Sequence, residues 1–179
     1  MSNYLDLVKR RESCRNFDPN RLVEKEKLAL CAEAAWLAPS ACNSQPWRYL
    51  IVTNAELVEK LRPLMQEFGM NKFVNQCPAF VVVLEEPTRL KVSVTSKFKD
   101  QDFAPIDVGL STSQFCYEAT ELGLSTCIIG WHNEPKIKEL FQIDKVSRVR
   151  LVLCVGYAAT EELRKKQRKP VEDVIKYYE

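Results

Sequence analysis

The chain has 179 residues, of which 46% are hydrophobic and 28% charged, an ordinary globular composition. Its formal net charge of +2 argues against a protein whose main task is nucleic-acid binding. No run of about 18 apolar residues occurs, so no transmembrane helix is expected. The N-terminal segment MSNYLDLVKRRES becomes charged too early for a secretory signal. We expect one domain that spans residues 1–179.

The first twelve residues look helical and end in the basic pair Arg10–Arg11. A second helix is predicted over residues 24–38, because apolar side chains recur there at a period of 3.6 residues. That apolar face consists of Leu28, Cys31, Ala32, Ala35 and Ala38. Pro39 ends the helix, because proline lacks the backbone N–H that a helix needs.

The rest of the chain alternates between strand and helix patterns. Strands are predicted at 48–53, 79–84, 125–130 and 149–155, and helices at 55–68, 104–122 and 134–141. The 55–68 helix is interrupted by Pro63, and Gly123 is placed to cap the 104–122 helix. The polar segment 86–103 is interpreted as a loop or cover. Four strands interleaved with helices predict an α+β or α/β sandwich around one sheet.

The cysteines and glycines limit the possible chemistry. Seven cysteines are scattered without a C-x-x-C pair, which indicates reduced thiols and a cytoplasmic protein. The single histidine, His132, argues against a histidine-rich metal site, and none is expected. Neither a Gly-x-Gly-x-x-Gly turn nor a P-loop motif is present. With five glycines in the chain, a bound phosphate would be held mainly by cationic side chains.

The segment RRESCRNF, residues 10–17, carries three arginines and a serine within six positions. Two guanidinium groups and a hydroxyl make a clamp suited to a phosphate monoester. The alternative is a solvated basic helix end, which the helix dipole favours. A second basic run, LRKKQRK at 163–169, is either a solvated charge run or a second contact to the same phosphate.

The segment PSACNSQPW, residues 39–47, is a polar loop between two apolar elements, with prolines that restrict its backbone. Its asparagine and glutamine suit the edge of a heterocycle such as a flavin. The alternative is a turn in which Ser40 and Asn43 satisfy the local backbone. In ELGLSTCIIGW, residues 121–131, Gly130 would let a ligand ring approach the backbone closely. An ordinary helix-strand connection explains that segment equally well.

Taken in this order, these segments resemble the FMN-dependent nitroreductase family, and in particular its short-chain members. The resemblance extends from RRESCRNFDP through PSACNSQPW and GLSTCIIGW to KKQRKP. It implies a three-layer α+β sandwich with a mostly antiparallel central sheet flanked by helices. It also implies an intertwined homodimer with FMN at the subunit interface. The apolar segment VIKYY, residues 174–178, suits a chain end that wraps around a partner.

The resemblance also assigns site residues. The loop against the partner's flavin would include Pro39, Ser40 and Asn43. Asn71 would contact the flavin, and the backbone N–H at Ile129 or Gly130 would face flavin N5. The phosphate and ribityl chain of FMN would be held by Arg11, Glu12, Ser13, Arg15, Lys166 and Arg168.

The implied activity is an NAD(P)H oxidoreductase that works by ping-pong hydride transfer through flavin N5. Its acceptors would be nitroaromatics, quinones or similar electron-poor molecules. No side chain stands out as a general acid, and no catalytic residue is assigned. Two alternatives stay open: a flavin-binding or flavin-storage protein without NAD(P)H turnover, and a specialised, dehalogenase-like FMN enzyme of the same fold.

Overall fold

The structure is a computed structural model that describes residues 3–88 and 101–179. In this part of the chain, one antiparallel sheet has the strand order β1-β2-β4-β3. Its strands are β1 (Trp47–Val52), β2 (Ala79–Glu85), β3 (Ser125–Ile129) and β4 (Arg148–Gly156). The α-helices are α1 (Tyr4–Arg10), α2 (Lys25–Trp36), α3 (Ala55–Leu61), α5 (Phe103–Glu121) and α6 (Glu134–Phe141). These elements confirm the predicted order of helices and strands.

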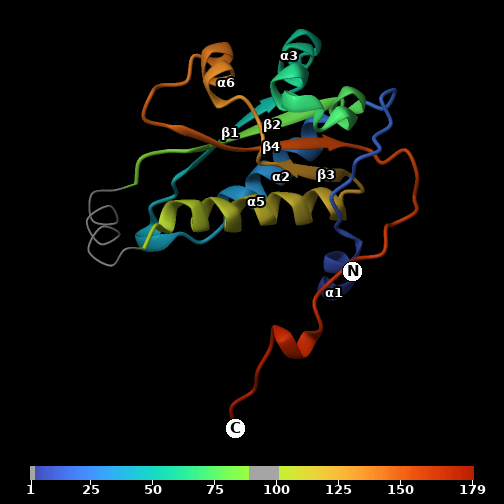
Figure 1. Cartoon of the computed structure of the whole chain (residues 1–179), viewed down its shortest axis with the longest axis vertical. Helices are drawn as coiled ribbons and strands as arrows, with labels where there is room; N and C mark the ends of the chain where they lie inside the picture. Colours follow the sequence, from blue (N-terminus) through green and yellow to red (C-terminus); the bar gives the residue numbers. More distant parts are fainter. Residues whose placement is uncertain (1–2, 89–100) are drawn as a thin grey trace.

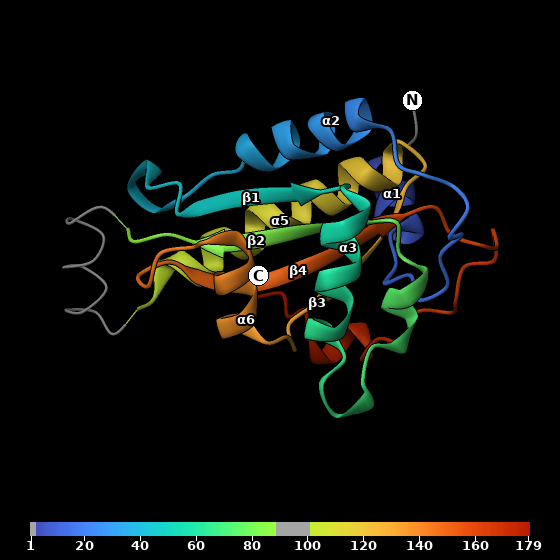
Figure 2. The same ribbon diagram turned by 90° about the horizontal axis from the view of Figure 1, so that it is seen from above.

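The sheet separates two hydrophobic cores. Along β2, Phe80 and Val82 face the core beneath α3 and α6, whereas Val81 and Val83 face the core beneath α2 and α5. Figure 1 shows the sheet between these two helical layers, and Figure 2 shows the same layers from above. Both faces of β2 are buried, which explains its unbroken apolar sequence. The predicted three-layer α+β sandwich is confirmed.

The helix ends follow the local sequence. In α2 most of the predicted apolar face is buried, namely Leu28, Cys31 and Ala35, while Ala32 is partly buried. The helix ends two residues before the predicted boundary, so the buried Ala38 lies beyond it. After α5, Gly123 adopts a left-handed φ of 77°, and Leu124 N–H donates to the Ala119 carbonyl at 2.7 Å. The predicted break at Pro63 is present: α3 ends at Leu61, and a 3₁₀ helix with Pro63 in its first turn spans Arg62–Met65. Further 3₁₀ helices span Ala41–Asn43, Glu67–Gly69, Lys72–Gln76 and Val171–Asp173.

The seven cysteines are free thiols, and all except Cys42 are buried. Burial raises the pKa of Cys31 to about 12 and that of Cys127 to about 11. Since the thiolate is the reactive form, these two side chains pack rather than react. No helix in the described residues is long and apolar enough to cross a bilayer. Most of the predicted loop 86–103 lies outside the described residues.

The segment that follows α1 continues the sheet edge. Cys14 N–H donates to the Thr126 carbonyl at 2.9 Å, and Ser13 forms a parallel bridge with Thr126 of β3. Phe17, three residues after Cys14, forms an antiparallel bridge with Ala158, just beyond β4. These contacts fix the arginine-rich segment beside β3.

Candidate functional site

A basic cavity of about 450 Å³ lies between the arginine-rich segment after α1 and the chain that follows β4. The two sides of the cavity are more than 145 residues apart in sequence. Both basic motifs singled out in the sequence therefore meet at one place. The residues that line it are Arg11, Glu12, Ser13, Arg15, Arg164, Lys165, Lys166, Gln167 and Arg168.

Hydrogen bonds hold the C-terminal segment against the N-terminal one. Arg164 donates to the Glu12 carboxylate from its backbone N–H at 3.2 Å and from its side-chain Nε at 3.4 Å. The Arg164 guanidinium also donates to the Ser13 carbonyl, and Lys166 Nζ donates to the Lys9 carbonyl. Glu12 thus orders the cavity wall through Arg164. Sequence reasoning missed Arg164, whose only signal was its place in a run of cations.

The cavity gathers positive charge. The pKa of Lys166 lies below its usual value because of partial burial and the nearby charge of Arg11, with a smaller contribution from Arg168. Glu12 opposes this effect but does not reverse it. An anion placed among these cations would favour their charged forms. The donor set therefore suits a phosphate group.

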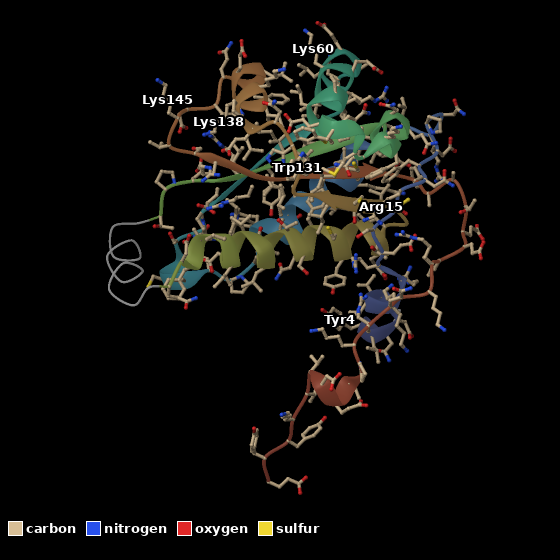
Figure 3. The ribbon with its side chains drawn as sticks, viewed as in Figure 1. Tyr4, Arg15, Lys60, Trp131, Lys138 and Lys145 are labelled. Carbon is tan, nitrogen blue, oxygen red and sulfur yellow. The ribbon has the colours of Figure 1, made fainter. Side chains whose placement is uncertain are left out.

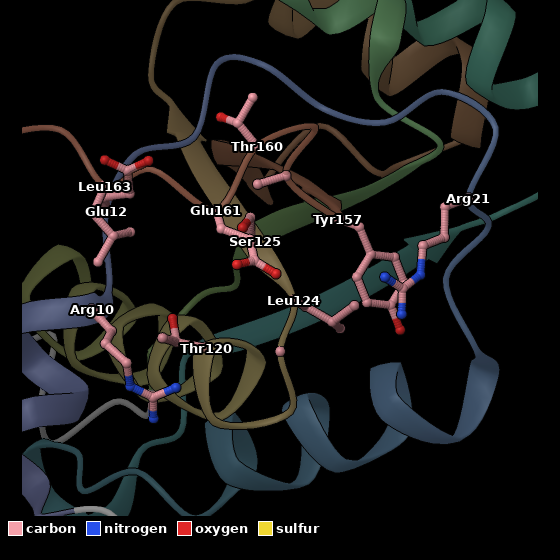
Figure 4. A pocket seen from close by; sticks show the side chains of 12 residues that line it. Arg10, Glu12, Arg21, Thr120, Leu124, Ser125, Tyr157, Thr160, Glu161 and Leu163 are labelled. Atoms are coloured by element: carbon pink, nitrogen blue, oxygen red, sulfur yellow. The ribbon is translucent and has the colours of Figure 1, made fainter.

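A larger neighbouring cavity, of about 610 Å³, is less suited to an anion (Figure 4). Arg10 at its edge pairs with Glu121 at 2.7 Å. Arg21 lies over the ring of Tyr157, with its guanidinium carbon 3.3 Å from the ring centroid. Both arginines already have side-chain partners here, whereas the smaller cavity brings Arg11, Arg15, Lys166 and Arg168 together.

From the basic cavity, β3 leads along the sheet edge to Gly130. Thr126 lies beside Ser13, and Gly130 follows four residues later, a distance of about 13 Å along a strand. Ile129 is buried and pairs with Val152 of β4. A Cβ added at Gly130 would meet no atom within 4 Å, so the space over this backbone is open. The stretch of β3 and its end from Thr126 to Gly130, called the track below, therefore connects the arginine-rich segment with the open backbone at Gly130.

Asn71 lies three residues after Phe68, whose ring contacts Trp131, the residue after Gly130. Its Nδ2 donates to the Met65 carbonyl at 3.0 Å, which fixes the turn around it. In the same turn, Phe68 packs edge-on against Trp131, with ring centroids 6.0 Å apart. Phe68 is 88% exposed and Trp131 is 50% exposed. Sequence reasoning did not single out these two aromatics, of which Trp131 directly follows Gly130; Trp131 and Arg15 are labelled in Figure 3.

The loop at 39–45 lies far from the basic cavity of the same chain. Its Ala41 N–H is bonded to Asp107 near the start of α5, whereas Arg10, just before the basic cavity, pairs with Glu121 at the end of α5. These two positions on α5 are 14 residues apart, or about 21 Å along the helix. Figure 1 shows the loop and α1 at opposite ends of α5.

Ser40 and Asn43 make the local bonds expected of a self-bonded turn. Ser40 Oγ accepts from Gln45 N–H, and Asn43 Oδ1 accepts from Gln45 Nε2, both at 2.9 Å. Pro39 precedes this turn. One chain therefore does not bring Pro39, Ser40 and Asn43 to the basic cavity. The other predicted residues lie in three places: Ile129 and Gly130 at the end of β3, Asn71 before the 3₁₀ helix Lys72–Gln76, and the remainder in the basic cavity, namely Arg11, Glu12, Ser13, Arg15, Lys166 and Arg168.

The fold and the cavity define a three-layer α+β protein with a basic cavity beside the edge of its sheet. The chain belongs to the nitroreductase family, whose family model matches residues 8–70 and 65–157. This result confirms the resemblance seen in the sequence motifs.

Individual relatives match along nearly the whole chain. YdgI of Bacillus subtilis, described as an NAD(P)H nitroreductase, is 27% identical over 205 aligned positions that cover 98% of both chains. The oxygen-insensitive NADPH nitroreductase of Helicobacter pylori J99 is 25% identical and covers 94% of this chain and 93% of its own. A crystal structure from Exiguobacterium sibiricum, described as a nitroreductase in complex with FMN, is 25% identical with a TM-score of 0.81. It covers 99% of this chain and 98% of that chain.

Proposed function

We propose that this protein is an FMN-dependent NAD(P)H oxidoreductase that reduces nitroaromatic, quinone or similar electron-poor acceptors. The observation that carries the proposal is the basic cavity between two distant segments, together with the open backbone at Gly130 at the far end of β3. The similarity to a nitroreductase in complex with FMN and to an NADPH nitroreductase supports the cofactor and the donor.

The chain's own residues divide into two groups along an FMN molecule. Arg11, Lys166 and Arg168 would hold the phosphate by charge-assisted hydrogen bonds, and Ser13 and Arg15 would bind the ribityl region. Glu12 keeps Arg164 and the cavity wall in place. FMN, when bound, supplies the transfer of hydride between donor and acceptor.

The flavin ring would lie at the other end of the track. The backbone N–H of Ile129 or Gly130 would donate to the ring at N5, and Asn71 would bind its edge. Phe68 and Trp131 would form an aromatic wall that stacks with nicotinamide or with an aromatic acceptor. No side chain is required as a nucleophile.

We propose that residues 1–179 form one domain and that two copies form a cytoplasmic homodimer with FMN between them. The distance between the 39–45 loop and the cavity supports a partner's loop over each flavin. Exposed apolar side chains on the outer faces of α2 and α5, and in the C-terminal segment, support a large covered surface. These side chains include Leu30, Trp36, Leu37, Ile106, Leu110, Val171, Val174, Ile175, Tyr177 and Tyr178. Figure 1 shows the C-terminal segment leaving the body of the molecule past α1.

Steady-state kinetics of the FMN-loaded protein test this proposal. We expect NADH or NADPH oxidation that depends on a quinone or nitroaromatic acceptor, with parallel double-reciprocal plots because donor and acceptor use one site in turn. Light scattering on the same sample should give the mass of a dimer. Tight FMN binding without acceptor-dependent oxidation would instead indicate a flavin-storage protein, and a monomer would contradict the shared site.

A further inference from the structure

Asp107 on α5 is a buried carboxylate in an unusual setting. Its side chain is 4% exposed, and no ion pair within residues 3–88 and 101–179 involves it. Burying a carboxylate away from cations is costly unless hydrogen bonds compensate. Its Oδ2 accepts a bond from the backbone N–H of Ala41 at 3.0 Å. The Asp107 carboxylate is thus bonded to the 39–45 loop.

The bond falls at the start of the loop's 3₁₀ turn. Ala41 is the first residue of that turn, and the preceding Ser40 makes no side-chain capping bond to it. Asp107 therefore acts as the cap from a different element. One helical turn later on α5, Ser111 Oγ donates to the Ala35 carbonyl at 2.7 Å. Together these two side chains tie α5 to the end of α2 and to the start of the loop.

The loop needs an external restraint because its backbone is strained. Cys42, Asn43 and Gln45 have φ values of 51°, 52° and 49°, the left-handed region that residues other than glycine rarely adopt. Such conformations persist only where the surroundings fix them. The internal bonds from Gln45 fix one side of the loop, and Asp107 fixes the other.

We propose that Asp107 is a positioning residue that holds the 39–45 loop in the conformation in which it meets the flavin of the partner subunit. This inference rests on the proposed FMN site. Asp107 then acts on the flavin bound by the other subunit, whereas Arg11 acts on the flavin bound by its own. The two residues affect the same cofactor only across the dimer.

Two variants separate the effect of the hydrogen bond between Asp107 and Ala41 from the effect of the negative charge of Asp107. Asp107→Ala removes the acceptor, and we expect kcat/KM of the FMN-loaded enzyme to fall about tenfold or more, with brighter flavin fluorescence as the loop loosens. Asp107→Asn keeps a carbonyl acceptor for Ala41 N–H, and we expect it to stay within about threefold of the wild type. A loss of function in Asp107→Asn equal to that in Asp107→Ala would overturn the proposed contact.

Mixed dimers test the action across subunits. Asp107→Ala and Arg11→Ala subunits with different tags are co-expressed, and the doubly tagged dimer is isolated. One of its two sites then combines an intact Arg11 with an intact loop, so we expect about half of the wild-type activity, well above either variant homodimer. Activity no higher than the mean of the two homodimers would overturn the inference. This result differs from a failure of the proposed function, in which the wild type itself would bind no FMN.

Discussion

Replacing Arg11 by alanine is expected to raise the dissociation constant for FMN about ten- to a hundredfold. Arg11 lines the basic cavity, and it is one of the charges that lower the pKa of Lys166 there. A hydrogen bond to a charged group contributes about 1.5–3 kcal/mol, and each 1.4 kcal/mol is a factor of ten in affinity. Titration of the apoprotein with FMN, followed by quenching of flavin fluorescence, measures the change.

Arg10 provides a matched control. It is the neighbouring arginine, but its guanidinium is paired with Glu121 at 2.7 Å, and it lines the larger cavity rather than the basic one. An exposed ion pair of this kind contributes about 1 kcal/mol or less to stability. Arg10→Ala should leave FMN affinity unchanged within about twofold. Equal losses of affinity in the two variants would mean that FMN responds to the general basic field and not to this cavity.

Replacing Phe17 by alanine is expected to destabilise the protein by about 3–5 kcal/mol, the usual cost of deleting a buried phenylalanine. Phe17 is 1% exposed and packs in the core between the sheet and α3. A Cβ added at Gly156 would come within 2.9 Å of its ring, so no spare space surrounds it. Since domains are stable by only about 5–15 kcal/mol, this is a large fraction of the total.

The segment around Phe17 also fixes the position of the arginine-rich side of the basic cavity. The backbone on either side of it bonds to the chain after β4: Asp18 N–H donates to Tyr157 O, and Ala159 N–H donates to Asn16 O, both at 2.9 Å. Urea unfolding at fixed protein and FMN concentrations measures the loss, because binding and dimerisation add to apparent stability. Phe68→Ala is the control. Its side chain is 88% exposed, so the expected cost is about 1 kcal/mol or less. Similar costs for the two variants would contradict the packing described for Phe17.

Periodicity predicted most of the fold. Three features could be recognised within single segments: the 3.6-residue pattern of α2, the apolar run of β2 and the glycine after α5. Each reflects how that segment is buried or capped, so no knowledge of distant residues is needed. The predicted break at Pro63 in the 55–68 helix is confirmed, but the segment beyond Leu61 forms 3₁₀ helices rather than an α-helix.

The site was predictable where charged side chains gather in short runs. Arg11 and Lys166 belong to such runs, and the structure brings them into one cavity. Arg164 belongs to the same run as Lys166, but the run does not show that Arg164 bonds to Glu12. Asp107 gave no signal, because it acts through a bond to a residue far away in sequence. Spacing along the chain gives neither the packing of Phe68 against Trp131 nor the distance from the 39–45 loop to the basic cavity.

The most direct test of the central claim is a visible absorption spectrum of the purified, FMN-reconstituted protein during anaerobic addition of NADH and then NADPH. We predict flavin absorption bands that remain with the protein through gel filtration and that bleach on addition of a stoichiometric amount of at least one nucleotide. That result would establish both the cofactor and the electron donor. A protein that retains no FMN after reconstitution, or whose bound flavin neither nucleotide bleaches, would contradict the assignment as an FMN-dependent NAD(P)H oxidoreductase.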